Sequence, residues 1–167
     1  FSGVKYYVGF GDFLSGEMGN EVKYDIKHTN DIFTKEVGGN YFGKTLNGSQ
    51  ISASDLQAAW RDIGSKITDR DMYVQYSSGH GSHTGLGFGV SYNQIRDNAL
   101  SYPAKEIIIF IMSCYSGNLV DSFNTKKSVW GDWSSKGRTL MVLASSKPSE
   151  SSSTGPGKDP EEPGGPD

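Results

Sequence analysis

The chain contains very little cysteine: Cys114 is the single one among 167 residues. One thiol excludes a disulfide within the chain and every zinc site that needs several thiolates. No apolar run approaches the roughly 20 residues of a membrane-spanning helix, so we expect no membrane span. Basic residues are not in excess either, with 16 against 19 acidic residues and a net charge of −3. The absence of a basic stripe argues against a nucleic-acid partner.

Hydrophobic side chains are missing altogether from the last stretch, "SESSSTGPGKDPEEPGGPD", which runs from Ser149 to Asp167. Such a segment cannot bury apolar surface to offset the entropy lost on ordering. The rest of the chain is long enough for one domain with a substantial core. We therefore expect a domain at residues 1–148 and a flexible linker or processed tail at residues 149–167.

Strand-like and helix-like segments alternate along this domain. Residues 54–67 give the clearest helix: Leu56, Trp60, Ile63 and Ile67 recur at helical spacing, and Ser52 with Asp55 resembles a capping box. We expect further helices at 25–37, 91–100 and 118–123, and strands at 4–10, 41–46, 72–77, 106–112 and 139–145. This alternation predicts an α/β three-layer sandwich, with a mostly parallel sheet covered by helices on both faces. The unbroken apolar run Ile107–Met112 predicts a central strand that is buried on both faces.

Two of the predicted strands end in residues that can carry chemistry. "YVQYSSGHGS" places His80 after the strand at 72–77, and "IIIFIMSCYSG" places Cys114 after the strand at 106–112. Parallel strands that are neighbours in sequence usually lie side by side, and ligands bind beyond their carboxyl ends. An imidazole next to a thiol can act as the base that generates the nucleophilic thiolate. The N–H groups of Gly81 and Cys114 could then stabilise a developing oxyanion.

Other interpretations of the same residues stay open at this point. A single cysteine on an apolar strand is often a small buried hydrophobe, and His80 on its own could be a turn or surface residue. His80 and His83 could form a metal pair, but three histidines and one cysteine supply few ligands. We therefore expect no metal and no cofactor. The two glycine-flanked strand ends together favour catalysis.

The His-Gly and Cys-x-Ser-Gly segments resemble those of the caspase-like cysteine peptidases, and most closely the legumain (asparaginyl endopeptidase) family. "HGSHTGLGFG", "YDIKHTND" (Tyr24 to Asp31) and "PSESSS" (Pro148 to Ser153) also resemble legumain segments. The resemblance spans residues 4 to about 153. It implies a caspase-like fold and an endopeptidase that needs no cofactor. It slightly favours a secreted or extracytoplasmic protein.

Carried over position by position, the resemblance implies a nucleophile at Cys114, a general acid/base at His80 and an oxyanion donor at Gly81. Asp25 stands where legumain has an asparagine that orients the histidine; helix capping is an equal interpretation of this aspartate. The implied specificity-pocket residues are Lys27, His28, Ser151 and Ser152.

The sequence departs from the legumain pattern around the cysteine. Met112 and Tyr115 stand where legumain has glutamates. A pocket that holds Lys27 without an acidic neighbour favours an anionic side chain, so we expect cleavage after Asp as well as, or instead of, Asn.

The partners expected are a peptide substrate and a second subunit that would follow the linker in sequence, with Asp167 as a processing site. An artificial chain end or disorder at Asp167 is the alternative. Two other functions stay open. In a transamidase or ligase, an amine would resolve the same acyl-enzyme. An inactive binding module would need neither Cys114 nor His80.

Overall fold

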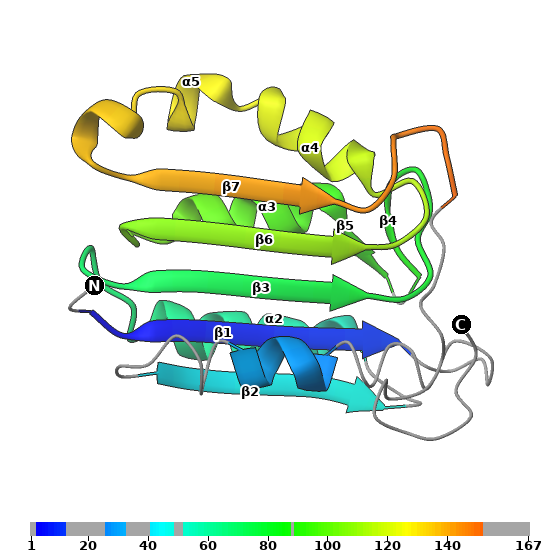
Figure 1. Ribbon diagram of the computed structural model, residues 1–167, viewed down its shortest axis with the longest axis horizontal. Coiled ribbons are helices and arrows are strands. Elements are labelled where there is room, and N and C mark those ends of the chain that lie inside the picture. The colour runs from blue at the N-terminus through cyan, green and yellow to red at the C-terminus, as the bar shows by residue number, and fades with distance from the viewer. Residues whose placement is uncertain (1–2, 13–25, 33–40, 49–51, 88, 152–167) are drawn as a thin grey trace.

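A five-stranded parallel sheet forms the centre of the computed structural model, which describes residues 3–12, 26–32, 41–48, 52–87 and 89–151. The strands lie in the order β2-β1-β3-β6-β7 (Figure 1). Their bounds are β1 (Lys5–Asp12), β2 (Tyr41–Gly48), β3 (Met72–Ser78), β6 (Glu106–Met112) and β7 (Thr139–Ala144). The segments predicted as strands are therefore confirmed, with their ends shifted by a few residues at most.

Helices cover both faces of this sheet. Three of them, α2 (Ala53–Gly64), α3 (Tyr92–Ser101) and α4 (Gly117–Asn124), share one large apolar core with β1, β3 and β6. The helical residues 26–32 lie on the other face, where Ile26 packs with Tyr7 and Val74. Figure 1 shows α2 and α3 behind the sheet and the helix at 26–32 in front of β1 and β2. The predicted three-layer α/β sandwich is confirmed.

Local sequence explains where the helices begin. The Ser52 hydroxyl accepts from the Asp55 N–H, and the Asp55 carboxylate accepts from the Ser52 N–H at 3.1 Å, which forms the predicted capping box. Ser91 and Gln94 form a second capping box at the start of α3. Helix α2 ends at Gly64, three residues earlier than predicted. Ile67 fits the apolar spacing of the helix, but it reaches the core from the turn that follows Gly64.

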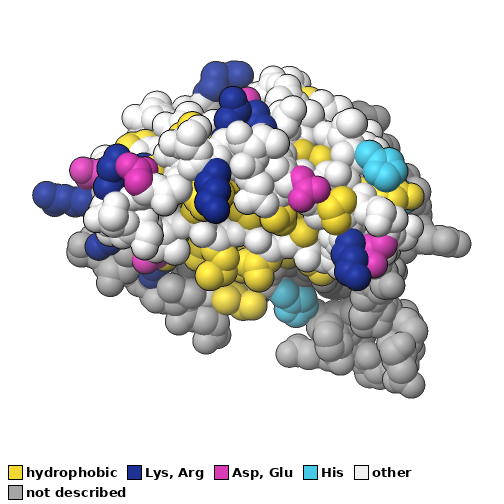
Figure 2. Space-filling model, turned by 90° about the horizontal axis from the view of Figure 1, so that it is seen from above, with side chains coloured by type: hydrophobic (Ala, Val, Ile, Leu, Met, Phe, Trp, Pro, Cys, Tyr) yellow, Lys and Arg dark blue, Asp and Glu magenta, His cyan; other side chains and the backbone are white. Residues whose placement is uncertain are grey.

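The prediction that the β6 strand is buried on both faces is wrong. Ile107, Ile109 and Ile111 are completely buried, whereas the alternate residues are only partly buried and Met112 is 39% exposed. The same face continues on β7, where Met141 is 47% and Leu143 is 42% exposed. No helix in the described part of the chain covers this side of β6 and β7. Figure 2, which looks down from the β7 side, shows hydrophobic side chains gathered on the surface there.

Several short elements had no signal in the sequence. The strands β4 (Gly85–Leu86) and β5 (Val90–Ser91) pair as an antiparallel hairpin between β3 and α3. Helix α5 (Lys127–Trp130) and a 3-10 helix (Ser134–Lys136) connect α4 to β7. Elements of two to four residues are too short to show a periodic hydrophobic pattern. The predicted helix at 25–37 is helical over 26–32, and its remaining residues lie outside the described ranges.

None of the helices in the described ranges has the length and apolar character required to cross a membrane.

Candidate active site

The ends of β3 and β6 lie side by side, as predicted. The two strands pair directly, and their last matched residues are Ser78 and Met112. The Gly79 N–H donates to the Met112 carbonyl at 3.2 Å, so the contact continues past the strands. His80 follows Ser78 by two positions, and Cys114 follows Met112 by two. The fold therefore brings the imidazole-bearing turn and the thiol-bearing turn to one edge of the sheet.

Gly81 makes the closest approach between these two turns. A Cβ atom placed on Gly81 would collide with the Cys114 carbonyl oxygen and lie 2.8 Å from the Ser113 Oγ. Only glycine allows the two backbones to approach so closely at this point. In the hydrogen-bond network of the described residues, the N–H groups of Gly81 and Cys114 donate to no protein acceptor. Neither N–H is therefore committed to a protein acceptor in the described part of the chain.

Cys114 is half-buried and its thiol is free, so the residue is not sealed in the core. The residue before it, Ser113, is 2% exposed and anchors the turn beneath the site. The turn is also tied to the loop after β7. The Tyr115 N–H donates to the Glu150 carbonyl at 2.9 Å, and the Ser116 N–H donates to the Ser146 Oγ at 3.2 Å. Cys114 thus projects from a turn that is held on both sides.

Tyr92, the first residue of α3, links the histidine turn to the cysteine turn through its hydroxyl. Its hydroxyl donates to the Ser82 carbonyl at 2.6 Å and lies 3.4 Å from the Cys114 carbonyl. Burial raises the pKa of the Tyr92 phenol, and the nearby Cys114 raises it further. The phenol therefore keeps its proton and remains a donor at neutral pH. A buried phenol needs a hydrogen-bond partner, and nothing in the sequence indicated that the partners of Tyr92 would be these two turns.

An aromatic pair borders the cysteine turn. The rings of His83 and Tyr115 stack at a centroid distance of 4.1 Å with 29° between their planes. Tyr115 has a positive φ of 59°, the only such value for a non-glycine residue in the described ranges. Residues held in this rarely populated region cluster at functional sites. The sequence showed Tyr115 as a departure from the legumain pattern, but the spacing of 32 positions gave no signal that it would meet His83.

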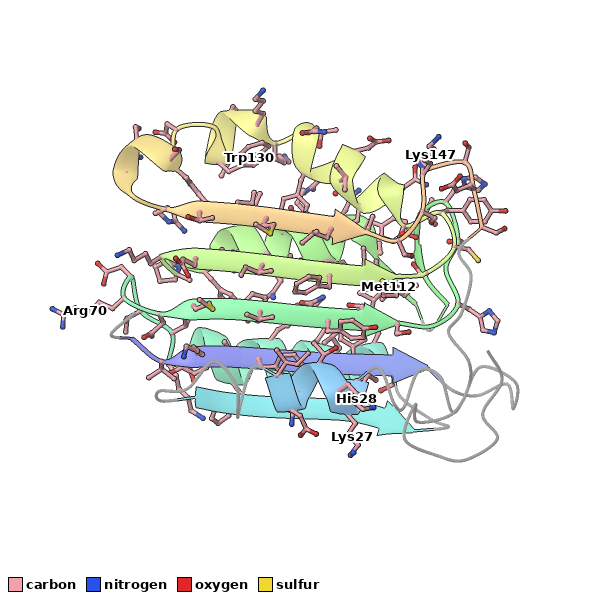
Figure 3. The ribbon with its side chains drawn as sticks, viewed as in Figure 1. Lys27, His28, Arg70, Met112, Trp130 and Lys147 are labelled. Carbon is pink, nitrogen blue, oxygen red and sulfur yellow. The ribbon has the colours of Figure 1, made fainter. Side chains whose placement is uncertain are left out.

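The structure describes three of the four predicted specificity residues. Lys27 is exposed and His28 half-buried on the helix at 26–32, and Ser151 is exposed at the end of the described chain. Figure 3 shows Lys27 and His28 in front of β1 and β2, with Lys27 directed away from Met112 at the end of β6. Asp25, Ser152 and Asp167 lie outside the described residues. The roles implied for these positions remain predictions.

A separate groove of about 780 Å³ lies at the opposite end of the sheet, where β3, β6 and β7 begin. Its basic side chains are Arg70, Lys105, Lys136 and Arg138, and its lining residues include no thiol and no imidazole. Lys136 is paired with Asp132 at 3.0 Å, and Arg138 donates to the backbone carbonyls of Tyr102 and Ala104. Because it lacks a nucleophile, this groove is not the candidate active site.

No protein-family model matches the chain, and no curated protein matches it significantly.

Proposed function

We propose that the chain is a cysteine endopeptidase of the legumain or caspase-like type, with Cys114 as nucleophile and His80 as general acid/base. The observation that carries the proposal is the contact of Gly81 with the Cys114 carbonyl, because it places the turn bearing His80 directly against the turn bearing Cys114. A half-buried free thiol, an adjacent histidine turn and two unused backbone donors are the parts that acyl transfer requires.

The proposed reaction proceeds through a thioester. His80 takes the proton of the Cys114 thiol, and the sulfur attacks the carbonyl carbon of the scissile peptide bond. The carbonyl oxygen becomes an oxyanion that accepts hydrogen bonds from the Gly81 and Cys114 N–H groups. The C–N bond then breaks as protonated His80 gives its proton to the leaving amine. Water, activated by His80, hydrolyses the thioester and regenerates the thiol.

Substrate choice is proposed to favour Asp or Asn before the scissile bond. The support is the resemblance to legumain, in which Lys27 matches a pocket arginine and Met112 stands in place of a glutamate. A cation in a specificity pocket favours a carboxylate over a neutral side chain. His28 and Ser151 are proposed to contribute polar contacts to the same side chain.

A second subunit is proposed to cover the exposed strip of the sheet. This strip consists of the exposed Met112, Met141 and Leu143 and the half-buried Ile108 and Phe110. They lie on one face because Ile108 pairs with Met141 and Phe110 with Leu143. Parallel sheets are normally covered on both faces. The outer edge of β7 also has no partner strand among the described residues, so an added strand could pair there.

The decisive experiment is labelling with a peptidyl acyloxymethyl ketone, followed by mass spectrometry. We expect one adduct on Cys114, lost in Cys114→Ala and strongly slowed in His80→Ala. The matched control is His83→Ala, which removes a nearby imidazole and leaves the proposed base in place. Absence of any adduct on the wild-type thiol, or equal labelling in His80→Ala and wild type, would contradict the dyad.

A panel of peptides that differ only before the scissile bond then tests the specificity. Preference for Asp or Asn, reduced in Lys27→Ala, is expected; preference for Arg or Lys would overturn this part of the proposal. Addition of an amine nucleophile to the same reactions shows whether water or the amine resolves the thioester, and so separates a peptidase from a transamidase.

A further inference from the structure

The aromatic pair and the predicted specificity residues lie on opposite faces of the sheet. His83 precedes the β4–β5 hairpin, and the hairpin residues Leu86 and Val90 belong to the core beneath α2, α3 and α4. The helix at 26–32 carries Lys27 and His28 and packs through Ile26 on the other face. Cys114 stands at the sheet edge between the two faces. Because the turn that carries His83 follows the turn that carries His80, a peptide whose scissile bond lies at Cys114 has His83 and Tyr115 within the same group of turns.

The backbone of Tyr115 is held in its unusual conformation by its neighbours. The Tyr115 N–H donates to Glu150 at 2.9 Å, and its carbonyl accepts from both the backbone and the side-chain nitrogen of Asn118, at 3.1 and 2.9 Å. A positive φ at a bulky residue is unfavourable and persists only when surrounding contacts enforce it. In Tyr115 this conformation accompanies the stacking of the ring on His83.

The pair also presents an accessible surface. Tyr115 is half-buried and His83 is exposed, so the stack is not a core contact. Tyr115 directly follows the proposed nucleophile in sequence, and its ring stacks on His83, which follows the proposed base by three positions. Flat aromatic faces of this kind bind planar side chains by offset stacking or edge-to-face contact.

We propose that His83 and Tyr115 form a binding site for the substrate residue after the scissile bond, and that this site selects an aromatic side chain. The inference rests on the proposed function, since it names the leaving-group half of the same substrate. If an amine resolves the thioester, the incoming amine occupies the same position and is selected by the same rings.

Two peptide substrates that differ only after the scissile bond, one with Phe and one with Leu, provide the test. Leu is the control for hydrophobicity, because it offers apolar surface without a planar ring. For the wild type we expect kcat/KM to be roughly three- to tenfold higher with Phe, the range that aromatic pairs provide beyond area burial. In His83→Ala we expect this ratio to fall to near one.

Variants of Tyr115 separate the ring from the backbone. Tyr115→Phe keeps the ring and is expected to keep the preference. Tyr115→Asn removes the ring but tolerates the left-handed backbone conformation, so it is expected to lose the preference while the turn keeps its shape. An unchanged Phe-to-Leu ratio in both Tyr115→Asn and His83→Ala would overturn the inference.

Ketone labelling of Cys114 distinguishes this failure from failure of the proposed function, because the probe has no residue after the scissile position. If the wild type is labelled normally but its kcat/KM is equal for the Phe and Leu peptides, the aromatic site is overturned and the peptidase proposal stands. No labelling in the wild type contradicts the peptidase proposal and, with it, the inference. If Tyr115→Asn alone loses labelling, His83→Ala becomes the deciding variant, because it changes no residue of the cysteine turn itself and removes only the ring stacked on Tyr115.

Discussion

At the scale of single residues, the candidate site depends on one position without a side chain. Gly81 lies so close to Cys114 that any Cβ would meet the Cys114 carbonyl oxygen and Ser113. The glycine brings two backbone turns together and also leaves the Gly81 N–H pointing to no protein acceptor among the described residues. The same residue therefore sets both the shape of the site and one of its proposed oxyanion donors.

Gly81→Ala is expected to damage the site more than the fold. The added methyl group must push the histidine turn away from Cys114, so the oxyanion donor moves, and kcat/KM should fall on the order of a hundredfold. Peptide hydrolysis and thermal unfolding measure the two effects. Gly64→Ala is the control, because its Cβ would meet only the Tyr102 ring at 3.3 Å at the end of a helix. An active Gly81→Ala variant would show that the close approach is dispensable.

Tyr92→Phe tests the bridge between the two turns. The ring would stay packed, but the Ser82 carbonyl would lose its 2.6 Å donor. A typical hydrogen bond contributes about 1 kcal/mol to the free energy of unfolding. We expect a stability loss of that order, measured by urea unfolding, and a drop in the labelling rate of Cys114. A labelling rate equal to that of the wild type would limit Tyr92 to a structural role.

At the scale of elements, β7 has two unlike faces. Val142 packs against the core shared with α4, whereas Leu143 is 42% exposed on the uncovered side. A strand alternates its side chains between the two faces of a sheet, so neighbouring residues report on different surroundings. Association with the proposed second subunit should therefore depend only on the side chains of the exposed face.

The pair Leu143→Glu and Val142→Glu separates these faces. Leu143→Glu should leave the free energy of unfolding within about 0.5 kcal/mol of wild type, as surface changes usually do. It should weaken association with a covering subunit, measured by sedimentation. Val142→Glu places an unpaired carboxylate at a half-buried position against the core and should destabilise the domain clearly more than Leu143→Glu does. Strong destabilisation by Leu143→Glu would mean that the strip is already covered within this chain.

At the scale of the whole molecule, buried tyrosines make the stability of the fold decrease at alkaline pH. Burial raises the pKa of Tyr102 to about 12, and burial also raises the pKa of Tyr7 and Tyr73 well above the ordinary value. In the unfolded chain, tyrosines ionise near pH 10. The folded state therefore retains protons that the unfolded state releases. The stability contributed by these phenols is complete below about pH 10 and is lost as the pH rises through the folded-state values.

Urea unfolding at about pH 8 and about pH 11 should therefore show a clear loss of stability at the higher pH. In Tyr102→Phe the loss should be smaller, because one titrating group is gone. This variant should also be less stable at the lower pH, since the Tyr102 hydroxyl donates to the Trp60 carbonyl at 2.7 Å. A pH dependence identical to that of the wild type would contradict the role assigned to Tyr102.

Sequence periodicity predicted each strand of the main sheet and the helices α2, α3 and α4, because buried faces repeat with a fixed period and capping residues mark the helix starts. It also predicted that His80 and Cys114 lie at adjacent strand ends, since parallel strands direct their carboxyl ends to one edge. The burial of β6 was predicted wrongly. An apolar run shows that a strand can be covered on both faces, but not that a partner covers it.

Other features were decided by the tertiary structure alone. The stack of His83 on Tyr115 and the bridge from Tyr92 to Ser82 join residues whose separation in the chain follows no period. The sequence by itself determined the layers of the molecule and the edge where its reactive residues gather, because these follow from local pattern and chain direction. Only the folded chain determined which side chains meet around the thiol, because those contacts depend on how separate turns pack against each other.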